Sequence, residues 1–177
     1  MKILIIIGIL LILGTIYVLI LLNSKSRFNF LNIKIKEADS NINLYLQKKK
    51  TTLNNIIKIS IDEKQDDGKF DDFDNLVKKP KDSFELHSTL NKYYSILSNL
   101  LLENEELSKN EDIVNHLVNL KSNEEDLIGS IKFYNDTIVD YNGLVSAFPH
   151  RIYARIHGLN NKDFYNNEKE ELFDILK

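Results

Sequence analysis

The sequence predicts an all-α protein: an N-terminal transmembrane helix, then an antiparallel bundle of three long helices plus a short C-terminal helix, which resembles a four-helix bundle. Three observations predict it. Residues 3–22 form an uncharged apolar stretch, and beyond it apolar residues recur in steps of three and four. The 177 residues include only two prolines and six glycines, so long helices run uninterrupted. We divide the chain into an anchor (1–24), a helical bundle domain (25–158) and a tail (159–177).

The apolar stretch from Ile3 to Leu22 has the length of a membrane span. Its only polar side chains are Thr15 and Tyr17, and at about 1.5 Å per residue it covers roughly 30 Å of hydrocarbon. A cleaved signal peptide is the alternative, but the stretch is long for one and no A-x-A-like site follows it. We therefore predict an uncleaved signal anchor, with the lipid bilayer as partner of residues 3–22.

Basic residues flank this stretch unequally. Only Lys2 precedes it, whereas Lys25, Arg27, Lys34 and Lys36 follow it closely. Basic residues near a membrane helix favour the cytoplasmic side. The sequence thus predicts a single-pass protein of the cell membrane with its soluble domain in the cytoplasm.

The first bundle helix is expected to continue the anchor, because no proline or glycine occurs from Asn23 to Asp67. A stop is expected at Asp66, Asp67 and Gly68. The stripe that would face the bundle consists of Phe28, Leu31, Ile35, Ala38, Ile42, Tyr45, Leu53 and Ile56.

The second helix follows Pro80, with Asp82 or Ser83 as its N-cap. Its stripe is Leu86, Leu90, Tyr93, Leu97 and Leu100.

The third helix is the most regular, and only Glu124 interrupts its apolar stripe. Ser108 and Glu111 have the spacing of a capping box at its start, and Pro149 is expected to end or bend it. The stripe comprises Ile113, Leu117, Leu120, Leu127, Ile131, Tyr134, Ile138, Tyr141, Val145 and Phe148.

Two short amphipathic stretches follow the third helix. The first runs from His150 to His157, and Gly158 closes it. The second, in the tail, runs from Glu168 to Leu176.

Composition excludes several classes of function. The net charge of −3 gives no bias toward nucleic acid, and the absence of cysteine excludes disulfides and thiolate chemistry. The sequence has no glycine-rich phosphate loop, no G-x-S-x-G and no H-E-x-x-H. We therefore predict no enzyme, no cofactor and no metal site.

Two charged stretches favour solvated surfaces over binding sites. The acidic segment from Asp66 to Asp74 matches a calcium-binding loop poorly, and a solvated interhelical loop is favoured. Lys48, Lys49 and Lys50 similarly favour a helix face turned to water over a docking face for an acidic partner.

One repeat in the third helix is more specific. Tyr134-Asn135 and Tyr141-Asn142 are seven residues apart, so the tyrosines share the bundle seam and the asparagines share a neighbouring stripe. Asparagine amides can bond to buried tyrosine hydroxyls and fix the helix register, which favours a structural role.

The run FYNDTIVDYNGLVSAFPHRIYARIHG, followed by Asp163-Phe164-Tyr165, resembles the C-terminal signature of the LemA family. The anchor and the long helix with Ile42, Leu46 and the basic Lys48-Lys49 also match its layout. Asn54 stands about where the family tends to have proline, and the middle of the chain departs from the pattern. The resemblance implies an all-helical domain on a single anchor and no established activity. Some members are encoded beside membrane zinc peptidases, which suggests such a partner.

These observations predict a non-enzymatic interaction protein of the cell envelope. Its candidate interaction or structural motif is Tyr134, Asn135, Tyr141, Asn142, Phe148 and Pro149. Two alternatives remain open: a self-associating spacer rod, for which a homo-oligomer is expected, and an enzyme with a composite site built on Glu124, His116 or His150.

Overall fold

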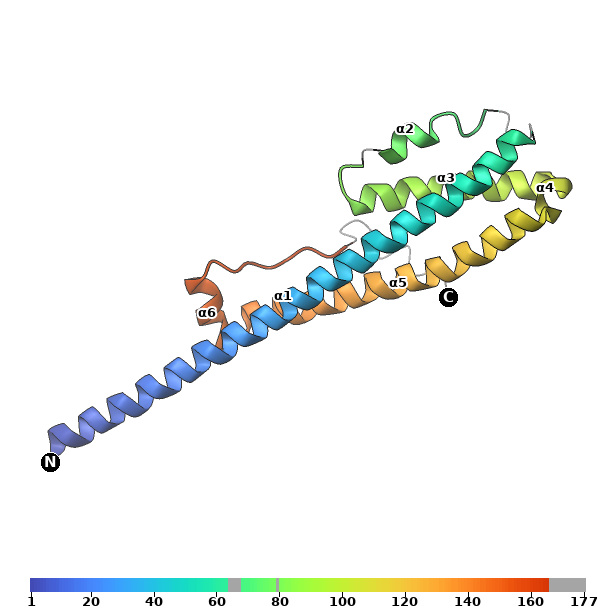
Figure 1. Cartoon of the computed structure of the whole chain (residues 1–177). Coiled ribbons are helices and arrows are strands. Elements are labelled where there is room, and N and C mark those ends of the chain that lie inside the picture. The colour runs from blue at the N-terminus through green and yellow to red at the C-terminus, as the bar shows by residue number, and fades with distance from the viewer. Residues whose placement is uncertain (64–67, 79, 166–177) are drawn as a thin grey trace. The chain divides into compact units, whose positions relative to one another are not determined.

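The computed structural model describes residues 1–63, 68–78 and 80–165, and this part of the chain is helical without a strand (Figure 1). The all-α prediction is therefore confirmed. The helices are α1 (Lys2–Asp62), α2 (Phe73–Lys78), α3 (Ser83–Glu103), α4 (Glu105–Lys109), α5 (Glu111–Ser146) and α6 (His150–Ile156). The predicted tail helix from Glu168 to Leu176 lies outside the described residues.

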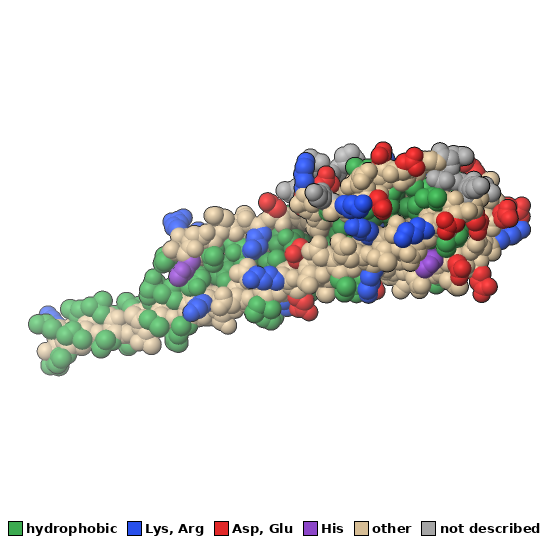
Figure 2. All heavy atoms as spheres, turned by 45° about the horizontal axis from the view of Figure 1, so that its top comes forward, with side chains coloured by type: hydrophobic (Ala, Val, Ile, Leu, Met, Phe, Trp, Pro, Cys, Tyr) green, Lys and Arg blue, Asp and Glu red, His purple; other side chains and the backbone are tan. Residues whose placement is uncertain are grey.

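Helix α1 runs without a break from the apolar stretch into the bundle, as the lack of helix breakers predicts. Its N-terminal part is long and apolar enough to cross a membrane and is not buried by the protein. Hydrophobic side chains project from the visible face of that part in Figure 2. Burial begins at Ser24 and Phe28, just past the stretch. The helix ends at Asp62, a turn before the expected stop; Gly68 beyond it has a φ of 72°, which glycine adopts without strain.

The chain forms two compact units, which are described separately. Unit 1 comprises residues 1–37 and the chain from residue 133 onward. Unit 2 comprises residues 38–132. Helices α1 and α5 each contribute one part to both units.

The core of unit 1 is built around Phe28. Its ring stacks on Tyr153 with centroids 5.7 Å apart and meets the edge of Tyr141 at 5.5 Å. The rings thus join α1, α5 and α6 through stacked and edge-to-face contacts. The buried cluster consists of Phe28, Ile35, Ile138, Tyr141, Leu144 and Ala154.

Unit 2 buries the predicted stripes of α1, α3 and α5. Its fully buried large side chains are Ile42, Leu46, Leu53, Ile56, Val77, Leu90, Leu97, Leu107, Ile113 and Leu127. The acidic segment before α3 is not simply a solvated loop, so that expectation is wrong. Phe70 and Phe73 are buried, and Phe73 meets the ring of Tyr93 edge-on at 5.0 Å.

The helix starts confirm one expected cap and correct another. Asp82 caps α3 by accepting from the Glu85 amide at 2.7 Å. Ser108 does not cap α5, because it lies inside the separate short helix α4. Asn110 takes the role and accepts from the first amides of α5. An asparagine between two helices satisfies the orphan amides of the second one.

The end of α5 agrees with the effect expected of Pro149. Helix α5 stops at Ser146, the Phe148–Pro149 bond is cis, and α6 begins at His150. Gly158 closes α6 with a φ of 63°. This turn brings α6 back against the core of unit 1.

Candidate interaction site

The two asparagines of the Tyr-Asn repeat hold the chain that follows α6. The Asn142 side chain donates to the Lys162 carbonyl at 2.9 Å and accepts from the Lys162 amide at 2.8 Å. Asn135 accepts from the Tyr165 amide at 2.9 Å. All three bonds reach main-chain atoms, so they are independent of the side chains that the bound segment carries. We call residues 159–165 the docked segment and the two asparagines the asparagine clamp.

The seven-residue spacing of the clamp matches the three-residue spacing of its partners. Seven helical residues rise about 10.5 Å, and three residues of extended chain cover about 10 Å. The docked segment therefore lies antiparallel to α5, with Tyr165 at Asn135 and Lys162 at Asn142. Figure 1 shows this segment leaving α6 as open, non-helical chain.

The tyrosines of the repeat lie beneath and beside the docked segment. Tyr141 is buried in the core, which raises the pKa of its hydroxyl. The Lys162 ammonium lies 5.2 Å from the centre of the Tyr141 ring. Tyr134 meets the Tyr165 ring edge-on at 6.4 Å. The repeat thus forms the docking surface for the segment. Its spacing predicted the shared stripes but not that the asparagines would hold main chain.

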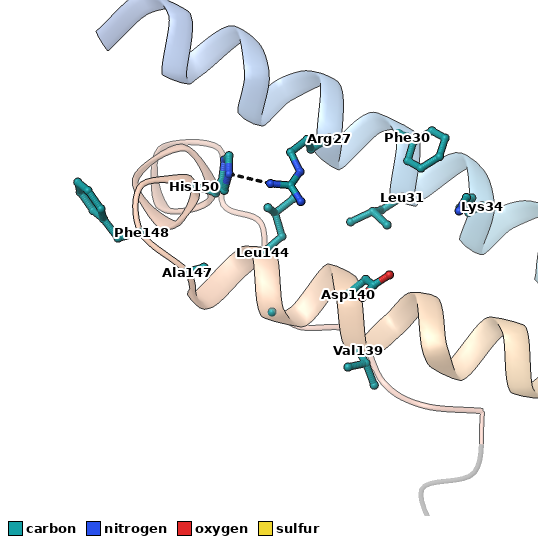
Figure 3. Close-up of a pocket in the computed structure, with 11 residues that line it drawn as sticks. Arg27, Phe30, Leu31, Lys34, Val139, Asp140, Leu144, Ala147, Phe148 and His150 are labelled. Atoms are coloured by element: carbon teal, nitrogen blue, oxygen red, sulfur yellow. Dashed lines mark hydrogen bonds between the residues drawn. The ribbon is translucent and has the colours of Figure 1, made fainter. Parts of the chain in front are cut away.

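Phe148 and Pro149, the other two predicted site residues, occupy the turn between α5 and α6. Phe148 is 72 % exposed and lines a pocket of about 680 Å³ in unit 1. Figure 3 shows the pocket between α1 and α5, with Arg27 and His150 at one end and Lys34 at the other. Its residues are Arg27, Phe30, Leu31, Lys34, Val139, Asp140, Gly143, Leu144, Ala147, Phe148 and His150.

A buried chain of hydrogen bonds joins this turn to α1. Ser24 donates to the Ile20 carbonyl at 2.7 Å and lies 2.8 Å from Nδ1 of His150. Because its proton is used on the carbonyl, the Ser24 oxygen accepts from Nδ1–H. Nε2 of His150 then accepts from the Arg27 guanidinium at 3.3 Å. Burial and the Arg27 charge both lower the pKa of His150, so the ring is neutral at pH 7.

This arrangement does not create a serine nucleophile. A histidine that activates serine must accept the hydroxyl proton, whereas here the serine proton points to a carbonyl and the histidine donates. Ser24 is also fully buried, so no substrate reaches it. The Ser24–His150 pair therefore fixes the turn against α1.

Unit 2 contains a second buried polar cluster, which corrects the expected role of the lysine run. Lys49 is only 2 % exposed and donates to Glu124 at 2.5 Å and to Asn91 at 2.6 Å. Nε2 of His87 lies 3.8 Å from the same carboxylate. Glu124, which interrupts the apolar stripe of α5, is the partner of the buried ammonium. Lys49 falls between Tyr45 and Leu53 of the α1 stripe, as Glu124 falls within the α5 stripe. The two charged residues pair because a buried charge requires an opposite one.

The pKa values of this pair follow from burial and pairing. Burial lowers the pKa of Lys49, and its bond to Glu124 offsets part of that effect. Burial acts to raise the pKa of Glu124, but hydrogen bonds from His87 and Lys49 outweigh it and lower the value. The pair lines a cavity of about 490 Å³.

The residues of the alternative composite enzyme site bond to different partners in different units. Glu124 is bound by Lys49 in unit 2, whereas His150 is bound by Ser24 and Arg27 in unit 1. His116 is half-buried on α5 in unit 2. Across the described residues, no group of three or more His, Asp or Glu side chains is arranged to hold a metal ion.

Over the residues that the structure describes, these features define an all-α bundle protein with one helix long and apolar enough to span a membrane. The family model for LemA matches residues 35–174, which is most of the chain. The chain therefore belongs to the LemA family. No curated protein and no solved structure matches it.

Proposed function

We propose that this LemA family member is a non-enzymatic, single-pass membrane protein that presents its helical bundle to a protein partner in the cell envelope. The asparagine clamp carries the proposal. Side-chain amides that bond to main chain accept an extended segment of any suitable protein, with pockets beside it supplying selectivity. A partner segment would take the place of residues 162–165 on Asn135 and Asn142.

The energetics support such an exchange. Each clamp hydrogen bond contributes about 0.5–1.5 kcal/mol net. Residues 162–165 are held by three of these bonds, the ring contact at Tyr134 and the Lys162 ammonium beside the Tyr141 ring, whereas Leu159, nearer to α6, packs against the core. A partner segment with comparable bonds and more apolar contact can therefore displace residues 162–165.

The polar groups buried in the bundle support a role without catalysis. Ser24 and Arg27 each bond to a ring nitrogen of His150, and Lys49 bonds to Glu124. General acid–base chemistry needs a titratable group whose proton is available to a substrate. Here the strongest candidates are already engaged with protein groups.

The clamp is tested by locking the docked segment in place. The chain has no cysteine, so Asn142→Cys with Lys162→Cys introduces the only disulfide possible. Partner cross-linking in native membranes is expected to be lost in the oxidised variant and to return after reduction to the level of Asn142→Cys alone, which keeps the Asn135 bond but lacks the Asn142 amide. Cross-linking that persists equally in both redox states would show that the partner binds elsewhere.

Removing the clamp amides provides a matched comparison. Asn135→Ala with Asn142→Ala is expected to reduce partner cross-linking while helical content stays unchanged. Asn119→Ala, on an exposed position of α5 in unit 2, serves as the control. Loss of helix in the double variant, or equal cross-linking in both variants, would assign the asparagines to structure alone.

Orientation is part of the proposal and has its own test. We propose that the bundle is cytoplasmic because Lys25, Arg27, Lys34 and Lys36 follow the span. Asp72→Cys, on an exposed position, should react with a membrane-impermeant thiol reagent only after lysis. Labelling of Asp72→Cys in intact cells would place the bundle outside.

A membrane zinc peptidase is the partner class suggested by family analogy. A second copy of the chain is the competing partner, and it corresponds to the self-associating spacer. Size measurement of the full chain in detergent separates the two. A stable homo-oligomer whose assembly depends on the asparagine clamp would favour self-association.

A further inference from the structure

The turn between α5 and α6 lies level with the end of the apolar stretch. His150 contacts Ser24 at 2.8 Å, and Ser24 is two residues beyond Leu22, a rise of about 3 Å. When residues 3–22 occupy the hydrocarbon core, this level is that of the lipid headgroups. The inference therefore rests on the proposed membrane anchor.

Phe148 projects from this turn into solvent. In Figure 3 it points away from Arg27, toward the side where the N-terminal part of α1 lies. It is 72 % exposed, although most of its neighbours in the stripe of α5 are buried. One exposed aromatic ring needs no explanation by itself. A ring at headgroup level is different, because aromatic side chains partition favourably into the membrane interface.

The charges around the turn have a single sign. No Asp or Glu occurs in residues 1–36 or 141–162, the two stretches that contain the turn and the start of the bundle. The exposed cations there include Lys25, Arg27, Arg151 and Arg155. Asp140, the acid that lines the pocket, lies about 10 Å farther up α5 from Ala147. The turn thus presents a positive surface although the whole chain is negative.

We propose that the turn and the start of α6 dock on the bilayer that contains the anchor, and that they select anionic phospholipids. Phe148 inserts among the headgroups. Arg27 and Arg151 bind lipid phosphates, which guanidinium groups contact through paired hydrogen bonds. The anchor and the turn are then two attachments to one membrane, and they restrict the tilt of unit 1.

His150 stiffens this attachment. His150 is buried beside Ser24 and bonded to Arg27, so the turn cannot swing away from α1 without breaking both contacts. A neutral His150 also avoids adding a buried charge next to Arg27. The geometry thus presents Phe148 to the membrane from a rigid support.

The absence of tryptophan makes the test direct. Full chains carrying one tryptophan each, at Phe148→Trp, Tyr17→Trp or Val118→Trp, are placed in nanodiscs of zwitterionic and anionic lipid with brominated acyl chains. Tyr17 lies within the apolar stretch, and Val118 is an exposed residue of unit 2. We expect strong quenching at Tyr17→Trp, intermediate quenching with a blue-shifted spectrum at Phe148→Trp, and none at Val118→Trp.

Each outcome distinguishes the proposals. Quenching at Tyr17→Trp with a water-exposed spectrum at Phe148→Trp would overturn the membrane-docked turn and leave the anchor intact. Absence of quenching at Tyr17→Trp would overturn the anchor itself.

Charge selectivity is tested by adding Arg151→Glu to Phe148→Trp. Quenching at Phe148→Trp should rise about two-fold or more with anionic lipid and should lose that increase with Arg151→Glu. Quenching that is indifferent to lipid charge would overturn the anionic selectivity.

Discussion

Unit 1 and unit 2 share two helices and both bury neutral polar side chains, but they differ in that unit 2 also holds an ion pair with a buried lysine. Unit 1 uses neutral groups: the Ser24–His150 pair, and the asparagine clamp on main chain. Unit 2 pairs the buried Lys49 ammonium with the partly exposed Glu124 carboxylate. A neutral group that is hydrogen-bonded when buried loses little free energy of hydration. Removing one partner of a buried ion pair is far more costly, because the other charge is left unpaired.

This difference in charge decides which contact can be exchanged for a contact with another chain. The docked segment in unit 1 can leave without stranding a charge, because the clamp amides can bond to water or to another chain. Loss of the Glu124 contact in unit 2 would leave the buried Lys49 side chain without its carboxylate partner. Unit 1 is therefore suited to binding, and the ion pair of unit 2 to fixing the pairing of α1 with α5.

The largest effect is expected from the aromatic core of unit 1. Phe28→Ala removes a ring that is 2 % exposed and contacts Tyr141 and Tyr153. Such truncations cost about 3–5 kcal/mol. Hydrogen exchange on the full chain in nanodiscs should show protection lost in unit 1 and largely kept in unit 2, with exposed Phe30→Ala as the control. Equal loss in both units would show that they unfold together.

The next effect concerns the ion pair of unit 2. Lys49→Ala leaves Glu124 without its ammonium and should destabilise unit 2 by about 2–4 kcal/mol, below the value for a fully buried pair because Glu124 is 32 % exposed. Lys48→Ala, on an exposed position, is the control. Lys49→Met with Glu124→Leu should recover most of the loss in urea unfolding. A double variant as unstable as the single one would show that the pair itself is needed.

The helices were predictable because each depends on a local pattern. The stripes of α3 and α5, the Asp82 cap and the break at Pro149 all follow from spacing within one segment. Helix α2 and the caps at Asn104 and Asn110 were missed. A helix this short is stabilised by tertiary packing, and it contains too few residues to show a helical period in the sequence.

The site residues were predicted by position but not by contact. The Tyr-Asn repeat marked Asn135 and Asn142, yet their partners lie 30 and 20 residues farther along the chain, respectively. The run of lysines predicts a solvated Lys49, and nothing near Glu124 in the sequence indicates a partner for its carboxylate. Pairing them requires knowing that α1 and α5 lie side by side in unit 2. A polar interruption in each of two apolar stripes was the available signal.

The asparagine clamp should give a smaller, local effect. Asn142→Ala removes two bonds to Lys162 and should raise amide exchange in the docked segment by about ten-fold, as expected for about 1–2 kcal/mol. Asn135→Ala removes one bond and should have about half that free-energy effect. Asn161→Ala, an exposed neighbour, is the control. Global unfolding of unit 1 in either clamp variant would contradict the exchangeable character of the segment.

The smallest effect is a difference in how acid affects the two units. Folding lowers the pKa of His150 below its ordinary 6.5, so the unfolded chain binds more protons just below that pH. Unit 1 should therefore begin to lose stability as the pH falls below 6.5, and the loss should level off below the folded pKa. Glu124 has its pKa lowered from 4.5, so its contribution to unit 2 is lost only in more acidic solution. Hydrogen exchange between pH 7.5 and 5 should show unit 1 weakening first, and His150→Asn should remove that early step. An early step that survives in His150→Asn would assign it to another group.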